Sequence, residues 1–199
     1  MPNIMIHEKV GYYFTLQDKS LDTGDFYLGL MAPDAVNLEG FASKEERWTS
    51  HIRDKDLTIW QNNIINFYKK ELNNYPKNFI LGYLIHILTD IIYDKYFYKE
   101  VIDKIVKGDG LTGDPHPIFL EYMKIYASNN DNSEEWVHIK EKLKNSNSYN
   151  ILNIDSNKLL LWKEKNIEKK ELITKENPYI TEDLIKKIYD KVREEYDKI

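Results

Sequence analysis

Residues 82–97 read GYLIHILTDIIYDKYF and lie in the most apolar part of the chain, which begins at Phe79. The run places His86 and Asp90 among isoleucines and leucines. Burying an imidazole and a carboxylate is costly unless another group pairs with them. The run is too short for a membrane span and carries polar groups, so it predicts a core helix from Pro76 to about Tyr98. The partner of these two polar groups is the main question about function.

The rest of the chain also predicts helices, and a length of 199 residues is typical of one domain. The sequence has neither sustained strand-like alternation nor an Asn-Gly hairpin signal. We expect an all-α, multi-helix domain at 1–145, with C-terminal helices at 146–199 packed on the same domain. Residues 18–42 contain several turn signals and are expected to form a loop. Besides the core helix and one capped by Ser133, the expected helices span 5–17, 43–51, 57–72, 117–127, 156–174 and 181–197.

The composition excludes several classes of function. The chain has no cysteine, which excludes disulfides, thiolate nucleophiles and cysteine zinc sites. A net charge of −5 argues against a nucleic-acid surface, and the lysines of 163–171 alternate with glutamates as on a solvated helix face. We expect a cytoplasmic protein without a membrane span or membrane role, because the N-terminus lacks the pattern of a signal peptide. The sequence does not indicate the oligomeric state.

His86 and Asp90 are one helical turn apart, so their side chains point the same way. A His and a carboxylate at this spacing can chelate one divalent cation. Gly82, one turn earlier, removes a side chain from that face and would leave room for an ion or substrate. The same pair could instead be a buried His hydrogen-bonded to its own Asp, and the spacing alone supports both interpretations equally.

Three other residues favour the metal interpretation. His7 and His51 are two of only five histidines, and His7 has apolar neighbours. Asp34 follows Pro33 in an apolar segment, where a carboxylate without a partner would be costly. Together with the first pair they form a nitrogen and oxygen ligand set that zinc accepts.

Four segments resemble the zinc-dependent phospholipase C superfamily, and in particular its shorter prokaryotic members: MPNIMIH, YLGLMAPDA, TSHIRD and LGYLIHILTD. The resemblance covers residues 1 to about 100. It implies an all-α fold, a cluster of zinc ions and hydrolysis of a phosphodiester or phosphomonoester. The substrate would be a small phosphoester or a lipid headgroup.

The resemblance also implies roles for individual residues. Asp34, His51, His86 and Asp90 would hold one zinc ion, and Asp90 would bridge to a second ion that His7 also holds. Asp34 corresponds to the favoured general base for the attacking water. Such chemistry needs metal because a bound divalent ion lowers the pKa of water and stabilises charge on phosphoryl oxygens.

The sequence departs from that family where ligands of a third zinc are expected. Residues 93–108 contain no histidine, and we expect His116 and His138 to be structural or surface residues. The resemblance therefore implies between one and three ions.

Two alternatives to the hydrolase remain open. The first is a non-catalytic relative that keeps a metal, or none, as a structural or ligand-binding module. The second is a phosphohydrolase of the His-Asp domain type, which the absence of a contiguous His-Asp pair disfavours.

Overall fold

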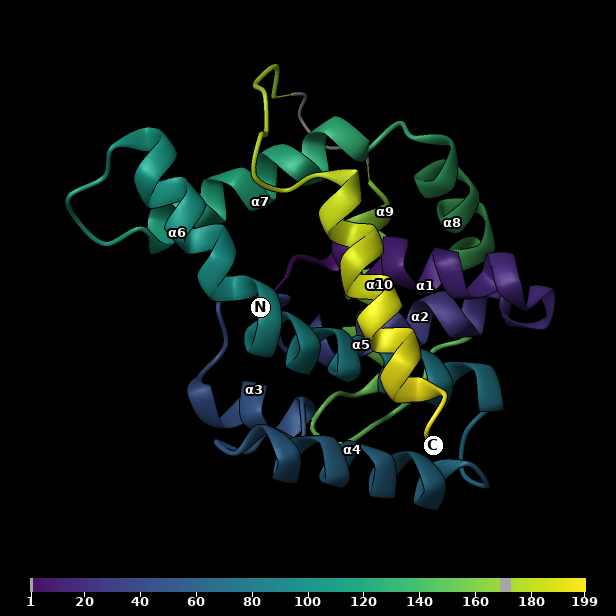
Figure 1. Cartoon of the computed structure of the whole chain (residues 1–199). Helices are drawn as coiled ribbons and strands as arrows, with labels where there is room; N and C mark the ends of the chain where they lie inside the picture. The colour runs from purple at the N-terminus through teal and green to yellow at the C-terminus, as the bar shows by residue number, and fades with distance from the viewer. Residues whose placement is uncertain (1, 169–172) are drawn as a thin grey trace.

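The long apolar helix α5 (Lys77–Ile92) runs through the centre of the protein in the computed structural model (Figure 1). The structure describes residues 2–168 and 173–199. Every residue of α5 from 79 to 92 is buried, which confirms the core helix. A π-helical turn, η3 (Tyr93–Phe97), follows it, and α6 (Tyr98–Asp109) continues the chain past the predicted end. Gly110, with φ of 63°, ends α6 in the left-handed conformation that favours glycine.

The other helices surround α5, and α1, α2, α4 and α10 contact it directly. The part of the chain that the structure describes contains no strand, only one isolated bridge between Ile151 and Ile154. The expectation of an all-α domain is therefore confirmed. The remaining elements are α1 (Ile4–Gln17), η1 (Lys19–Leu21), α2 (Gly24–Met31), η2 (Ala32–Asn37), α3 (Lys44–Ser50), α4 (Leu57–Glu71), α7 (His116–Asn130), α8 (Glu134–Lys144), α9 (Ser156–Ile167) and α10 (Glu182–Tyr196).

The predicted helix starts are confirmed by their capping hydrogen bonds. Ser43 and Glu46 form the reciprocal capping box at the start of α3. Asp56, Ser133 and Thr181 accept hydrogen bonds from main-chain N–H groups in the first turns of α4, α8 and α10. These caps satisfy donors that a helix N-terminus otherwise leaves unpaired.

The prediction of a loop over 18–42 was wrong, because this segment contains the buried helix α2. The Thr23 hydroxyl caps it by accepting from the main-chain N–H of Phe26. Residues 26–31 are all buried against neighbouring helices. The Asp-Thr-Gly-Asp signal at 22–25 marks the start of this helix and not a loop.

Gly29 of α2 and Gly82 of α5 bring the two helix backbones into direct contact. A Cβ on Gly82 would lie 2.1 Å from the Phe26 carbonyl oxygen, and one on Gly29 would lie 2.0 Å from the Phe79 carbonyl oxygen. The expectation that Gly82 leaves room for an ion or substrate was therefore wrong, since the backbone of α2 occupies that space. Only glycine allows such a close approach.

The C-terminal region packs on the N-terminal helices. The ring of Phe14 in α1 contacts Tyr189 and Tyr196 of α10, and Gln61 of α4 donates to Glu195. The helix predicted over 156–174 was too long, because α9 ends at Ile167 and residues 173–179 are not helical. Residues 169–172 of that prediction lie outside the described residues. No described helix has the length and apolar character needed to cross a membrane.

Candidate metal centre

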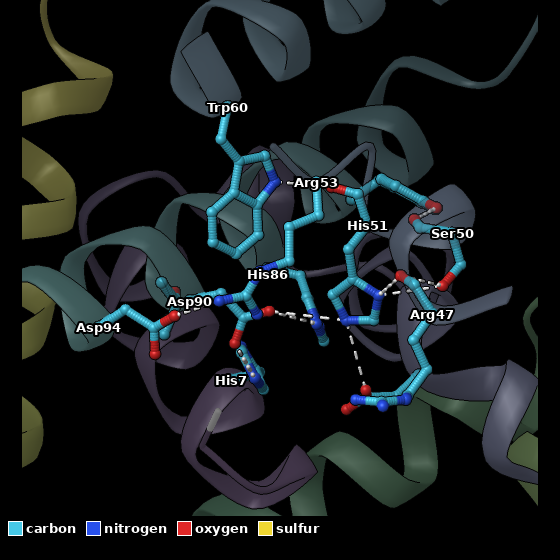
Figure 2. Close-up of polar contacts among 12 residues, drawn as sticks. His7, Arg47, Ser50, His51, Arg53, Trp60, His86, Asp90 and Asp94 are labelled. Carbon is cyan, nitrogen blue, oxygen red and sulfur yellow. Dashed lines mark hydrogen bonds and ion pairs between the residues drawn. The ribbon is translucent and has the colours of Figure 1, made fainter. Parts of the chain in front are cut away.

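Four separate elements bring the five candidate ligands together beside α5. His86 and Asp90 lie on α5, and His7 lies on α1. Asp34 belongs to the turn η2, which has Pro33 near its start, and His51 is the C-terminal cap of α3. Figure 2 shows dashed contacts that join the Asp90 carboxylate to the surrounding imidazoles. Residues far apart in the sequence thus form one group, hereafter the five-residue cluster.

Asp90 lies at the centre of this cluster. Its Oδ1 is 3.5 Å from Nε2 of His7, and its Oδ2 is 3.5 Å from Nε2 of His51. Nε2 of His86 is 3.7 Å from Asp90 Oδ2, and Nε2 of His51 is also 3.5 Å from Asp34 Oδ1. Atoms at these separations are too far apart for good hydrogen bonds, but they suit shared coordination of an ion.

The candidate ligands form two sets of three residues. Within each set, one ligand atom from each residue lies within 4.8 Å of the other two. The first set comprises His7, Asp34 and His86, and the second comprises His51, His86 and Asp90. His86 is therefore the residue common to both sets. The resemblance implied a different division, in which Asp90 is shared.

Several polar atoms of the cluster are buried without a hydrogen-bond partner. They are Nε2 of all three imidazoles, Nδ1 of His7 and both carboxylate oxygens of Asp90. Each buried polar atom left unsatisfied costs about 1–3 kcal/mol. The simple alternative of a His86–Asp90 hydrogen bond is absent, because His86 Nε2 and both Asp90 oxygens are among the unpaired atoms.

The ring orientations of His51 and His86 are set by main-chain carbonyls. Nδ1 of His86 lies 2.6 Å from the Leu30 oxygen, and Nδ1 of His51 lies 2.9 Å from the Arg47 oxygen. A carbonyl can only accept, so both Nδ1 atoms donate. In each neutral ring the Nε2 lone pair then faces the cluster, which is the arrangement found in metal-binding histidines.

Burial and mutual proximity shift the pKa values of the cluster. Burial raises the pKa of Asp90 to about 7 and lowers the pKa of His86 to about 4. Burial and the His86 imidazole lower the pKa of His7 well below its usual value. Neutral imidazoles are the form that binds metal, so His7 and His86 are ready to do so without losing a proton.

The pKa values of Asp34 and His51 shift in the opposite sense to those of Asp90 and His86. Burial disfavours the charged forms of Asp34 and His51, but the contact between these two side chains outweighs the effect of burial. The His51 and His86 imidazoles hold the pKa of Asp34 well below its usual range, and the Asp34 and Asp90 carboxylates raise the pKa of His51. Asp34 is therefore ionised at neutral pH. It is also the only cluster side chain with appreciable exposure, at 14%.

Two buried aromatic residues, Trp60 and Tyr83, position His51. The indole N–H of Trp60 donates to the His51 carbonyl oxygen over 2.7 Å, and the Tyr83 hydroxyl donates to the Ser50 carbonyl oxygen. Figure 2 shows Trp60 above the His51 turn. Both rings are fully buried, and residue type alone does not indicate which carbonyl each polar atom contacts.

His116 and His138 lie outside the cluster. Nε2 of His138 is 2.8 Å from Oδ1 of Asp22, whose other oxygen is 3.0 Å from Lys142 Nζ. The His116 ring lies against Phe119 and its Nδ1 is 3.5 Å from the Tyr98 hydroxyl. Within 2–168 and 173–199, the two sets above are the only groups of three potential ligands that could hold an ion.

No protein-family model matches this chain, and no curated protein or solved structure matches it either.

Proposed function

We propose that this protein is a metal-dependent phosphoester hydrolase whose five-residue cluster binds two divalent ions, with zinc as the preferred metal. The observation that carries the proposal is the group of unpaired Nε2 and carboxylate oxygen atoms that converge on one buried point. Three imidazoles and two carboxylates form the borderline-hard donor set that suits zinc. The absence of cysteine excludes thiolate ligands.

The chain's own residues would divide the work as follows. His7, His86 and Asp90 hold the buried side of the centre, and the carbonyls of Leu30 and Arg47 keep the rings of His86 and His51 in the binding orientation. Asp34 lies at the solvent-accessible edge, is ionised at neutral pH and can accept a proton from water. Bound divalent ions supply acidification of water and stabilisation of phosphoryl charge.

The low pKa of Asp34 makes it a weak base, so its role depends on that acidification. An ionised carboxylate can take a proton from a water molecule that is itself close to deprotonation. The substrate class would be a small phosphoester or a phosphorylated headgroup that can approach the Asp34 edge.

A second function is favoured by burial. Four of the five ligands have side-chain exposures of 0–1%, which is typical of a closed structural site and not of one with an open coordination position. In this alternative the metal stabilises the fold and no substrate reaches it.

Two measurements distinguish these functions. Elemental analysis of protein purified without added metal should give about two ions per chain. Turnover of aryl phosphomonoesters and phosphodiesters, with zinc, manganese or no added metal, should then be measured near neutral pH. Activity that requires metal supports the hydrolase, and complete inactivity of fully loaded protein on both substrate types would favour the structural role.

A further inference from the structure

An open groove of about 790 Å³ lies between α3, α4 and the turn at Leu152. Its volume is typical of sites for small molecules. Apolar walls come from Trp48, Ile52, Phe67 and Leu152, and none of the five cluster residues lines it. This groove is therefore a different site from the metal centre, although His51 belongs to the turn that forms one of its walls.

The backbone of this groove is strained at two aliphatic residues. Ile52 and Leu152, with φ of 51° and 52°, are the only non-glycine residues with positive φ in the ranges that the structure describes, and both line the groove. For a β-branched or bulky residue this conformation is a genuine outlier. Such strain concentrates at ligand sites and switch regions.

Local hydrogen bonding shows that glycine or asparagine would suit both positions better. Ile52 follows the C-cap of α3, where its N–H donates to the Thr49 oxygen and the next N–H donates to the Trp48 oxygen. This is a Schellman motif, whose left-handed position is usually glycine. Leu152 begins the two-residue turn between Ile151 and Ile154, which exchange two main-chain hydrogen bonds. Positive φ in such turns is usually taken by Gly, Asn or Asp.

Packing within the protein does not explain why residue 152 is a leucine. Leu152 is 47% exposed, so its strained backbone holds an apolar side chain in solvent. The neighbouring Asn153 amide donates to the Glu46 carbonyl oxygen, which anchors this turn against α3. An apolar ligand in the groove would bury the Leu152 side chain and use the conformation that the turn imposes.

Charges at the groove indicate the polarity of that ligand. Lys44 Nζ lies 4.6 Å from the centre of the Trp48 ring, and the Arg53 guanidinium lies 4.5 Å from the centre of the Trp60 ring. Arg53 also pairs with Asp94 at 2.8 Å, and Glu45 is the acidic residue of the lining. We propose that the groove binds a small organic anion, with its apolar body against Ile52, Leu152 and Trp48 and its charged group beside Lys44.

The test uses 1-naphthoate as the probe, with 1-naphthalenemethanol as its neutral counterpart. Naphthoate should bind one site per chain, more tightly than the alcohol, and it should shift the amide NMR signals of Thr49 to Arg53 and of Leu152. Binding should be the same in chelator-treated and zinc-loaded protein. Binding that requires zinc would assign the carboxylate to the metal centre and overturn the proposal.

Two variants locate the site. Leu152→Asn should raise the dissociation constant about five- to tenfold, as expected from losing part of a buried leucine side chain. Its Tm should be no lower than that of the wild type, because asparagine tolerates positive φ. Lys44→Glu, at the exposed first position of α3 where an acid suits the helix, should weaken naphthoate binding but not binding of the alcohol.

Leu120→Asn is the matched control, since Leu120 has 44% exposure and lies on α7, across the molecule from α3 and α4 (Figure 1). It should leave naphthoate binding unchanged. Unchanged binding in both groove variants, or equal loss in the control, would refute the groove as the site.

Discussion

The imidazoles of His7 and His86 stack face to face, with ring centres 3.7 Å apart and ring planes inclined by 8°. Two charged rings at this separation would repel each other in a buried site. Burial and this neighbour lower the pKa of His7, and burial lowers the pKa of His86 to about 4. The stacked pair therefore stays neutral near pH 7 and presents two unprotonated nitrogen ligands to the same point.

His86→Ala should abolish stabilisation by metal. Zinc at about 100 to 1,000 times its dissociation constant should add roughly 3–4 kcal/mol to the free energy of unfolding of the wild type, because it binds the native state. The variant lacks the ligand common to both sets, so its Tm should respond little to zinc or chelator. Thermal unfolding with zinc or chelator measures this, with His116→Ala as the control outside the cluster. A wild type whose Tm is unchanged after unfolding and refolding in chelator would exclude a stabilising metal.

Asp90→Asn should have opposite effects with and without metal. The folded-state pKa of Asp90 is about 7, above the unfolded value of about 3.9. Below about pH 4 this carboxyl is protonated in both the folded and the unfolded state, so it does not lower the stability. Between about pH 4 and pH 7 only the unfolded state ionises readily, and the free energy of unfolding falls. In chelator-treated protein at pH 8 the variant should be more stable by up to about 4 kcal/mol, since each pKa unit corresponds to about 1.4 kcal/mol.

Two comparisons check this prediction about Asp90. The gain in stability should shrink as the pH falls from 8 to 4, and in zinc-loaded protein the variant should be less stable than the wild type. Denaturant unfolding at several pH values measures both effects. A pH-independent loss of stability in the metal-free variant would contradict the prediction.

Trp60→Phe should weaken metal binding without touching a ligand. The variant keeps an aromatic ring but leaves the His51 carbonyl without its buried donor, at a cost of about 1–3 kcal/mol. Loss of such supporting contacts typically lowers metal affinity about 10- to 100-fold. Trp162→Phe is the control, because the buried Trp162 Nε1 has no hydrogen-bond partner. Competition with a fluorescent zinc chelator gives both affinities, and equal affinity in the two variants would argue against positioning by Trp60.

Gly82→Ala should be strongly destabilising. Its Cβ would meet the Phe26 carbonyl oxygen at 2.1 Å, so α2 and α5 must separate, at a cost of about 3 kcal/mol or more. The same movement would take the Leu30 carbonyl away from Nδ1 of His86 and lower metal affinity. Gly113→Ala, with no atom within 4 Å of the added Cβ, should be nearly neutral. Similar Tm values for the two variants would show that the helices can adjust.

Asp34→Asn should abolish turnover if the hydrolase proposal holds. An amide cannot accept a proton from water and is a poorer ligand. His138→Ala should retain nearly full activity, because His138 contacts Asp22 and lies outside the cluster. Initial rates on the best aryl phosphoester, with metal content measured in parallel, test the pair. Full activity of Asp34→Asn would refute the role assigned to that carboxylate.

The parts of the fold that the sequence predicts are those governed by local patterns. The apolar run around His86 predicts a buried helix, and the Ser43 cap predicts the start of another. Helical spacing also predicts that His86 and Asp90 face the same way. The convergence of His7 and His51 on them was inferred from shared apolar context and from a family resemblance.

What the sequence did not predict depends on contacts between distant segments. Gly82 was misinterpreted because its neighbour is the backbone of α2, which is 56 positions earlier at Phe26. The carbonyl that orients His86 belongs to Leu30 and leaves no signature in residue type. The positive φ of Ile52 and Leu152 contradicts the preferences of both residue types, so no local rule could predict it.

The nearly complete burial of the cluster has a kinetic consequence. An ion held by His7, His86 and Asp90, each with no exposed side-chain surface, would leave past the Asp34 edge only when the chain around it opens. Exchange with external metal or chelator would then be limited by the rate of that opening and not by the affinity of the ligands. The metal found in purified protein would accordingly record which ion was available while the chain folded, more than which ion the site prefers at equilibrium.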